Sequence, residues 1–263
     1  MSWEIYQVDS FTERPFAGNP AGVCLLAAPA EDAWMRAVAA EMNVAETAFL
    51  VPRTDAAYDL RWFTPTVEVD LCGHATLASA HILWEQRRLP LAETARFHTR
   101  SGLLSAWRDG DTIRMDFPAE PAVTSEPPPE LRRALGVDFQ FAGRNRMDWL
   151  VEVADEATLG AVRPVLDALT AVGGRGVIVT ARSSSPERDF VSRFFAPAAG
   201  VDEDPVTGSA HCALAPYWSA KLGKTALTGF QASTRGGTVA CAVQGGRVVL
   251  GGHAVTVLRG TLL

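Results

Sequence analysis

The sequence predicts an α+β protein built as two similar lobes, in each of which β-strands surround one long helix. Three observations support this fold class. Segments of the first half recur in the second half in the same order, alternating apolar residues mark strands, and a helix of small residues follows the corresponding strands in both halves. With 263 residues, each lobe is long enough to bury a core of its own.

The internal repeat is the strongest of these observations. RWFTPTVEVD, from Arg61, corresponds to RFFAPAAGVD, from Arg193, 132 positions later. After three extra residues in the second copy, GHATLASA from Gly73 corresponds to GSAHCALA from Gly208, and a third match follows at the new offset. Three matches in one order indicate a structural unit that is used twice.

Residue periodicity places the elements along the chain. The expected strands and outer amphipathic helices are, in order, Glu4 to Asp9, Ala21 to Ala27, a helix near Asp32 to Met42, Glu46 to Val51, Tyr58 to Phe63, and a helix near Ala157 to Ala171 that contains Pro164. Gly-containing turns close two hairpins, SAWRDGDTIRMDF and VACAVQGGRVVL. A helix of Ala, Ser and Gly begins at Gly73 and runs to about Glu85, and its small side chains let other backbone segments approach closely.

A proline-rich segment separates the two lobes. FPAEPAVTSEPPPEL, residues 117–131, contains five prolines, which favour extended chain and remove backbone donors. We therefore expect an N-terminal lobe over residues 1–118, with the Glu46 strand and the helix from Gly73, and a C-terminal lobe over residues 119–263. The last strand, near Ala254 to Leu258, could stay in the second lobe or cross to the first.

Composition excludes several classes of function. A net charge of −6 without a run of Lys or Arg argues against nucleic acid as a partner. Because no stretch of about 18 apolar residues occurs and the N-terminus lacks the pattern of a signal peptide, we expect a cytoplasmic protein with no membrane partner. The sequence also lacks the GxSxG, Walker and GxGxxG motifs of serine hydrolases, NTPases and dinucleotide enzymes.

No metal site is expected from the spacing of the ligating residues. The four cysteines are scattered, and no CxxC or HExxH motif is present. His74 and His81 are seven residues apart on one helix, about 10.5 Å along its axis, which is too far to share one ion. Cys72, beside a helix start, is compatible either with a stabilised thiolate or with a small core residue.

Three polar positions distinguish the two copies, and each has a structural as well as a functional interpretation. Glu46 corresponds to the apolar Ile178, so it is either exposed by a local shift or half-buried for a reason. Asp204 lies in the three-residue insertion, where it either caps the following helix or acts in a site. His74 and Ser209 follow the paired glycines, at the starts of the two helices. Either the unpaired N–H groups there bind an anion, or Ser209 merely caps its helix and His74 merely fills a turn.

At these residues the sequence resembles the PhzF-like isomerases of phenazine biosynthesis, which are relatives of diaminopimelate epimerase. The resemblance covers nearly the whole chain and rests on VDSFTERPFAGNPAGV, MNVAETAFL, RWFTPTVEVDLCGHATLASA and DEDPVTGSAHCAL. It implies two similar pseudo-symmetric lobes, each an antiparallel barrel-like sheet around a central helix. It further implies an active site between the lobes, a homodimer, and no cofactor or metal.

The resemblance also implies the site residues, matched motif by motif. The catalytic residues would be Glu46, His74, Asp204 and Ser209, and Asn19 resembles a family position near the substrate. The other candidate substrate-binding residues, at or beside the two helix starts, are Cys72, Gly73, Thr207 and Gly208. Cys72 stands where the epimerases have one catalytic thiol, but Pro205 stands where they have the second. A symmetric two-thiol epimerisation is therefore not expected.

The expected activity is a cofactor-independent isomerisation of a small carboxylate-bearing substrate. Glu46 would take a proton from carbon and return it elsewhere, with its pKa raised by partial burial, while a neutral His74 and Asp204 assist. Backbone N–H groups at Gly73 and at Gly208 to Ser209 would hold an anionic oxygen. Two alternatives remain open: an amino-acid epimerase or racemase with Cys72 or Asp204 as the second base, and a non-catalytic protein that binds a small molecule.

Overall fold

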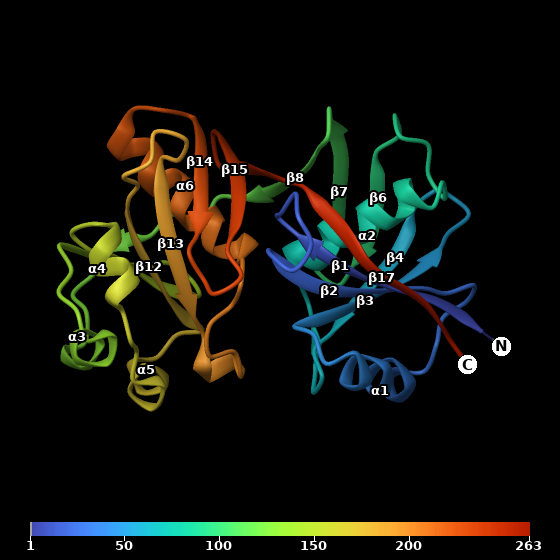
Figure 1. The fold of residues 1–263 in the computed structure, drawn as a ribbon, viewed down its shortest axis with the longest axis horizontal. Coiled ribbons are helices and arrows are strands. Elements are labelled where there is room, and N and C mark those ends of the chain that lie inside the picture. Colours follow the sequence, from blue (N-terminus) through green and yellow to red (C-terminus); the bar gives the residue numbers. More distant parts are fainter. Residues whose placement is uncertain (1) are drawn as a thin grey trace. The chain divides into compact units, whose positions relative to one another are not determined.

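The computed structural model describes residues 2–263, and chain contacts divide the protein into two compact units. Unit 1 contains Met1–Asp116 and Gly251–Leu263, and unit 2 contains Phe117–Leu250. The last strand, β17 (Ala254–Leu262), pairs along its length with β1 (Trp3–Ser10) and so belongs to unit 1 (Figure 1). Among the described residues, no helix is long and apolar enough to cross a membrane.

Unit 1 is a mixed sheet with two helices. Besides β1 and β17 its elements are β2 (Asn19–Leu25), α1 (Asp32–Met42), β3 (Glu46–Pro52), β4 (Tyr58–Phe63), β5 (Glu68–Val69), α2 (Gly73–Glu85), β6 (Ala95–Thr99), β7 (Gly102–Asp109) and β8 (Thr112–Pro118). β1 pairs antiparallel with β2, β2 parallel with β3, β3 antiparallel with β4, β4 parallel with β6, and β6 antiparallel with β7.

Unit 2 has the same order of pairings. Its elements are β9 (Val123–Thr124), α3 (Pro129–Leu135), β10 (Phe141–Arg144), β11 (Asp148–Glu152), α4 (Glu156–Ala161), α5 (Leu166–Val172), β12 (Gly176–Arg182), β13 (Phe190–Phe195), the 3-10 turn Pro197–Ala199, α6 (Gly208–Leu222), β14 (Ala226–Gln231), β15 (Gly237–Gln244) and β16 (Arg247–Gly252). β10 pairs antiparallel with β11, β11 parallel with β12, β12 antiparallel with β13, β13 parallel with β14, and β14 antiparallel with β15.

The prediction of purely antiparallel sheets is therefore wrong, and the connections explain why. A parallel pair needs a crossover connection, usually a helix, whereas antiparallel strands can be joined by a short turn. In unit 1, α1 connects β2 to β3 and α2 connects β4 to β6. In unit 2, α4 and α5 connect β11 to β12, and α6 connects β13 to β14. Each helical crossover returns the chain in its original direction and makes the pair parallel.

Helices α2 and α6 are the buried helices of their units, as their small residues predict. In α2 every residue from His74 to Ala80 is buried, and in α6 the buried run extends from Ala210 to Ala215. α2 packs against β1, β2, β3, β7 and β17, and α6 packs against β14 and β15. Because neither helix has an exposed face over these runs, the surrounding strands fix the position of each helix start.

Two segments of the chain differ from their predicted elements. The helix expected near Ala157 to Ala171 is two short helices, because Pro164 cannot supply the backbone donor that a continuous helix needs. The proline-rich segment is not wholly extended: α3 begins at Pro129, where the absence of an N–H costs nothing.

Candidate active site

The start of α2 brings a carboxylate, an imidazole and a thiol together in unit 1. Glu46 is the first residue of β3, Cys72 is the residue that precedes α2, and His74 is the second residue of that helix. Two hydrogen bonds fix the turn. Ser10 Oγ donates to the His74 carbonyl oxygen at 2.8 Å, and Thr76 Oγ1 donates to the Cys72 carbonyl oxygen at 2.6 Å.

The imidazole of His74 contacts both of the other groups. His74 Nε2 is 3.2 Å from Glu46 Oε2, and His74 Nδ1 is 3.5 Å from Cys72 Sγ. The side chains of His74 and Glu46 are only 7% and 19% exposed. Within unit 1, the predicted site residues Glu46, Cys72 and His74 thus form one contiguous group.

The pKa shifts of Glu46 and His74 are opposite in direction to those expected from the sequence. Burial alone would raise the pKa of Glu46, but the charge and hydrogen bond of His74, with the Cys72 thiol, outweigh it and hold that pKa below its ordinary value. Burial alone would lower the pKa of His74, but Cys72 and Glu46 raise it well above the ordinary value. The expected neutral histidine and raised glutamate are therefore replaced by a buried ion pair.

Asn19, the predicted binding residue of unit 1, is placed near this group by strand register. It is buried and begins β2, where it pairs with Ser10, the residue whose hydroxyl holds the His74 carbonyl. Two residues further along β2, Ala21 pairs with Glu46. Gly73 opens α2 between Cys72 and His74.

In unit 2 the insertion forms a hydrogen-bonded turn before α6. Thr207 Oγ1 donates to Asp204 Oδ2, and the Thr207 N–H donates to Gln231 Oε1 at 2.9 Å. Gln231 Nε2 donates to the Asp204 carbonyl oxygen at 2.7 Å, and this side chain is fully buried. Gln231 is a positioning residue that the sequence analysis missed, because an isolated glutamine 27 residues from Asp204 gives no sequence signal.

Ser209 is held by a second pair of residues that the sequence analysis missed. Arg175 Nη2 donates to Ser209 Oγ at 2.9 Å, and the same guanidinium binds Asp148 through two hydrogen bonds of 3.0 and 2.5 Å. Asp148 is fully buried, whereas the Arg175 side chain is one-third exposed. Because Arg175 donates to the Ser209 oxygen, the hydroxyl proton of Ser209 is directed to another acceptor.

Neither buried helix has a side-chain cap. Cys72 and Thr207 occupy the capping positions with extended backbone, and neither side chain accepts from the helix. Ser209 therefore does not serve as the cap that its sequence position allowed. The first N–H groups at Gly73 and Gly208 keep the partial positive charge of a helix start.

Comparison with known proteins identifies the family. The family model described as phenazine biosynthesis-like protein matches residues 8–260. An uncharacterised isomerase of Halalkalibacterium halodurans is 52% identical over 264 residues, covering 100% of this chain and 99% of the relative. The chain belongs to the PhzF-type phenazine biosynthesis-like family. The predicted resemblance is confirmed, and so is membership of a family whose relatives are named as isomerases.

Solved structures confirm the fold of this PhzF-family chain. A crystal structure of a PhzF-family phenazine biosynthesis protein from Enterococcus faecalis matches with a TM-score of 0.96 and 42% identity, with 100% of each chain covered. A predicted epimerase from Pseudomonas aeruginosa matches with a TM-score of 0.77 and 26% identity, with 99% of each chain covered.

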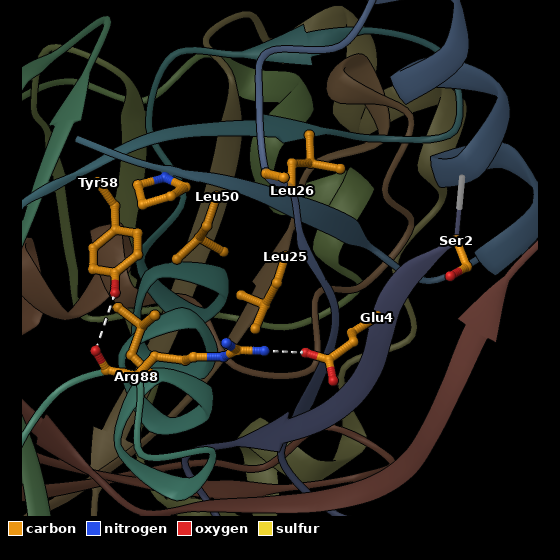
Figure 2. A pocket seen from close by; sticks show the side chains of 10 residues that line it. Ser2, Glu4, Leu25, Leu26, Leu50, Tyr58 and Arg88 are labelled. Carbon is orange, nitrogen blue, oxygen red and sulfur yellow. Dashed lines mark hydrogen bonds and ion pairs between the residues drawn. The ribbon is translucent and has the colours of Figure 1, made fainter. Parts of the chain in front are cut away.

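A pocket in unit 1 of the PhzF-family chain lies at the other end of α2. Its volume is about 490 Å³, and Leu83 is one of the residues that line it. Figure 2 shows the Glu4 to Arg88 ion pair and Tyr58 at its wall. Leu83 is nine residues from His74 on α2, about 13 Å along the helix axis. Since Glu4 and Arg88 neutralise each other and no predicted site residue lines the pocket, it is not the candidate active site.

The buried ion pair predicts an unusual titration of His74. In protein labelled with ¹³C-histidine, NMR should show His74 protonated well above pH 6.5, while burial lowers the pKa of His211 to about 4. Glu46→Gln should lower the pKa of His74, because burial then acts without the carboxylate. Since folding raises the pKa of His74, its stabilising contribution is full below pH 6.5 and is lost as pH rises through the folded value. An unchanged His74 titration in Glu46→Gln would contradict the pairing.

The contact between Arg175 and Asp148 predicts that replacing Arg175 destabilises the protein more than replacing another arginine of unit 2. Arg175→Met leaves the buried Asp148 carboxylate without its partner, and we expect a loss of about 2 kcal/mol in unfolding free energy, discounted for the partial exposure of Arg175. Arg146→Met is the control, because Arg146 pairs with Glu120 but is 71% exposed, and it should cost less than about 1 kcal/mol. Urea denaturation followed by tryptophan fluorescence measures both. Equal losses would contradict a structural role for the buried pair.

Proposed function

We propose that this PhzF-family protein is a cofactor-independent isomerase that moves a proton on a small carboxylate-bearing substrate. The observation that carries the proposal is the buried pair of Glu46 and His74, 3.2 Å apart at the start of α2. It supplies a proton acceptor and a proton donor side by side. Both are ionised over the pH range between their shifted pKa values.

In the proposed reaction Glu46 is the base. Its carboxylate takes a proton from a substrate carbon, and the C–H electron pair moves into the conjugated system of the substrate. The protonated His74 donates a hydrogen bond to the oxygen on which negative charge develops. Glu46 then returns its proton at a second carbon, and a double bond is displaced without net gain or loss of atoms.

The lowered pKa of Glu46 does not prevent this role. A weak base is matched to a carbon acid whose conjugate base is stabilised, and the cation at His74 provides that stabilisation in the transition state. When Glu46 becomes protonated, its attraction to His74 is lost and the imidazolium charge is released to the substrate. The attraction between His74 and Glu46 is therefore replaced, after proton transfer, by an attraction between His74 and the negatively charged substrate.

The proposed substrate contacts include residues of unit 2. Ser209 has a hydroxyl proton directed away from Arg175, and the N–H groups at Gly208 and Ser209 begin a helix without a side-chain cap. These donors suit a carboxylate. Asp204 and Ser209 are the proposed catalytic residues of unit 2, and Thr207 holds the Asp204 carboxylate in place.

An epimerase is the second candidate function. It is favoured by the 26% identical neighbour that is described as a predicted epimerase and by the Cys72 thiol, 3.5 Å from His74 Nδ1, as a candidate second base. An epimerase returns the proton to the same carbon from the opposite face, so connectivity is retained. An isomerase changes connectivity.

Proton NMR in heavy water tests the proposed function. A panel of cyclic and unsaturated amino and hydroxy acids, dihydro-hydroxyanthranilate included, is incubated with wild type, Glu46→Gln and the control Glu41→Gln, which replaces an exposed carboxylate. We expect deuterium at a substrate carbon with wild type and control, and a rate about 10² to 10⁴-fold lower with Glu46→Gln. Exchange by Glu46→Gln at the wild-type rate would exclude Glu46 as the base.

A further inference from the structure

Glu46, Cys72 and His74 also offer the ligand atoms of a transition-metal site. Among residues 2–263, this is a group in which thiol, imidazole and carboxylate ligand atoms all lie within 4.8 Å of one another. Spacings of ligating residues along the chain predicted no metal site. These three ligands come from β3, from the residue before α2 and from the first turn of α2, so only the fold brings them together.

The separations fit one small ion with modest adjustment. Zinc bonds of about 2.3 Å to sulfur and about 2.0 to 2.2 Å to nitrogen and oxygen place tetrahedral ligands about 3.3 to 3.6 Å apart. Here His74 Nε2 is 3.2 Å from Glu46 Oε2 and 4.0 Å from Cys72 Sγ. The third pair, Cys72 Sγ and the Glu46 oxygen, lies within 4.8 Å, so the Cys72 side chain must move by up to about 1 Å to complete a tetrahedral set. Three protein ligands leave the fourth position open, as in zinc sites that exchange a ligand.

The chemistry of the set selects the ion. A thiolate and an imidazole favour Zn²⁺ and similar borderline or soft cations, whereas Mg²⁺ and Ca²⁺ prefer oxygen ligands and higher coordination numbers. The site is also held rigidly, because Ser10 and Thr76 anchor the backbone of His74 and Cys72. Cys24, Cys212 and Cys241 are also buried, but within residues 2–263 they belong to no such group.

We propose that Cys72, His74 and Glu46 bind Zn²⁺, and that the bound ion blocks proton transfer at this site. Binding displaces the Cys72 thiol proton and the His74 imidazolium proton into the solvent, and the carboxylate of Glu46 completes the set. The lone pairs that would accept a substrate proton are then used by the metal. Inhibition rests on the proposed function, but binding of the ion does not.

Zinc binding is measured by competition with a chromophoric chelator, with ZnCl₂ as the probe and MgCl₂ as the comparison. We expect one Zn²⁺ per chain, no competition from Mg²⁺, and affinity weakened about 100-fold or more in Cys72→Ala, from which the sulfur ligand is missing. Cys24→Ala, which removes another buried cysteine of unit 1, should bind like wild type. Equal zinc affinity in Cys72→Ala and wild type would overturn the proposal.

Cobalt spectroscopy gives a second measurement that does not depend on a variant folding. Co²⁺ added to wild-type protein should produce the near-ultraviolet band of a thiolate bound to cobalt together with strong visible bands of a four-coordinate ion, and Zn²⁺ should abolish both. Absence of the thiolate band would overturn the site. Because neither measurement uses a substrate, failure here leaves the proposed isomerase untouched, and failure to find proton exchange leaves the metal site untouched.

Discussion

The enclosure of α2 is the constraint on which the candidate site depends. Its side chains from His74 to Ala80 are all buried, and most are small enough for β1, β2 and β3 to approach the helix backbone. A helix held in this way cannot rotate without separating packed strands. Its first turn therefore presents His74 and Cys72 at a fixed place, and the parallel pairing of β2 with β3 sets Glu46 opposite them.

Burial and pairing together determine the protonation state of the site. Burial by itself favours neutral side chains, which is why a raised glutamate and a neutral histidine are the natural expectations from sequence. The charge of His74, 3.2 Å away, reverses the shift in the pKa of Glu46, and Cys72 together with the Glu46 carboxylate reverses the shift in the pKa of His74. Because Glu46, Cys72 and His74 lie so close together, two ligands are proposed to compete for them. One is a substrate that exchanges a proton with Glu46, and the other is a metal ion that displaces protons from Cys72 and His74.

Sequence reasoning was most successful where local patterns decide structure. The helices Asp32–Met42 and Gly73–Glu85 were predicted with these bounds, and four motifs together led to the correct family. It failed where distant residues meet. Parallel pairing depends on crossovers, and the contacts of Arg175 with Ser209 and of Gln231 with Thr207 span 34 and 24 residues without a motif. The roles of Asp204 and Ser209 in catalysis stay predictions.

The proposed chemistry of this site depends on Glu46 and His74 meeting as carboxylate and imidazolium. Neutron diffraction from a crystal exchanged into heavy water near pH 7 shows the protonation of both side chains, because deuterium positions are then observed rather than inferred. We expect deuterium on both Nδ1 and Nε2 of His74 and none on either Glu46 oxygen. A neutral imidazole beside a protonated Glu46 would rule out the ion pair and restore the expectation based on burial alone.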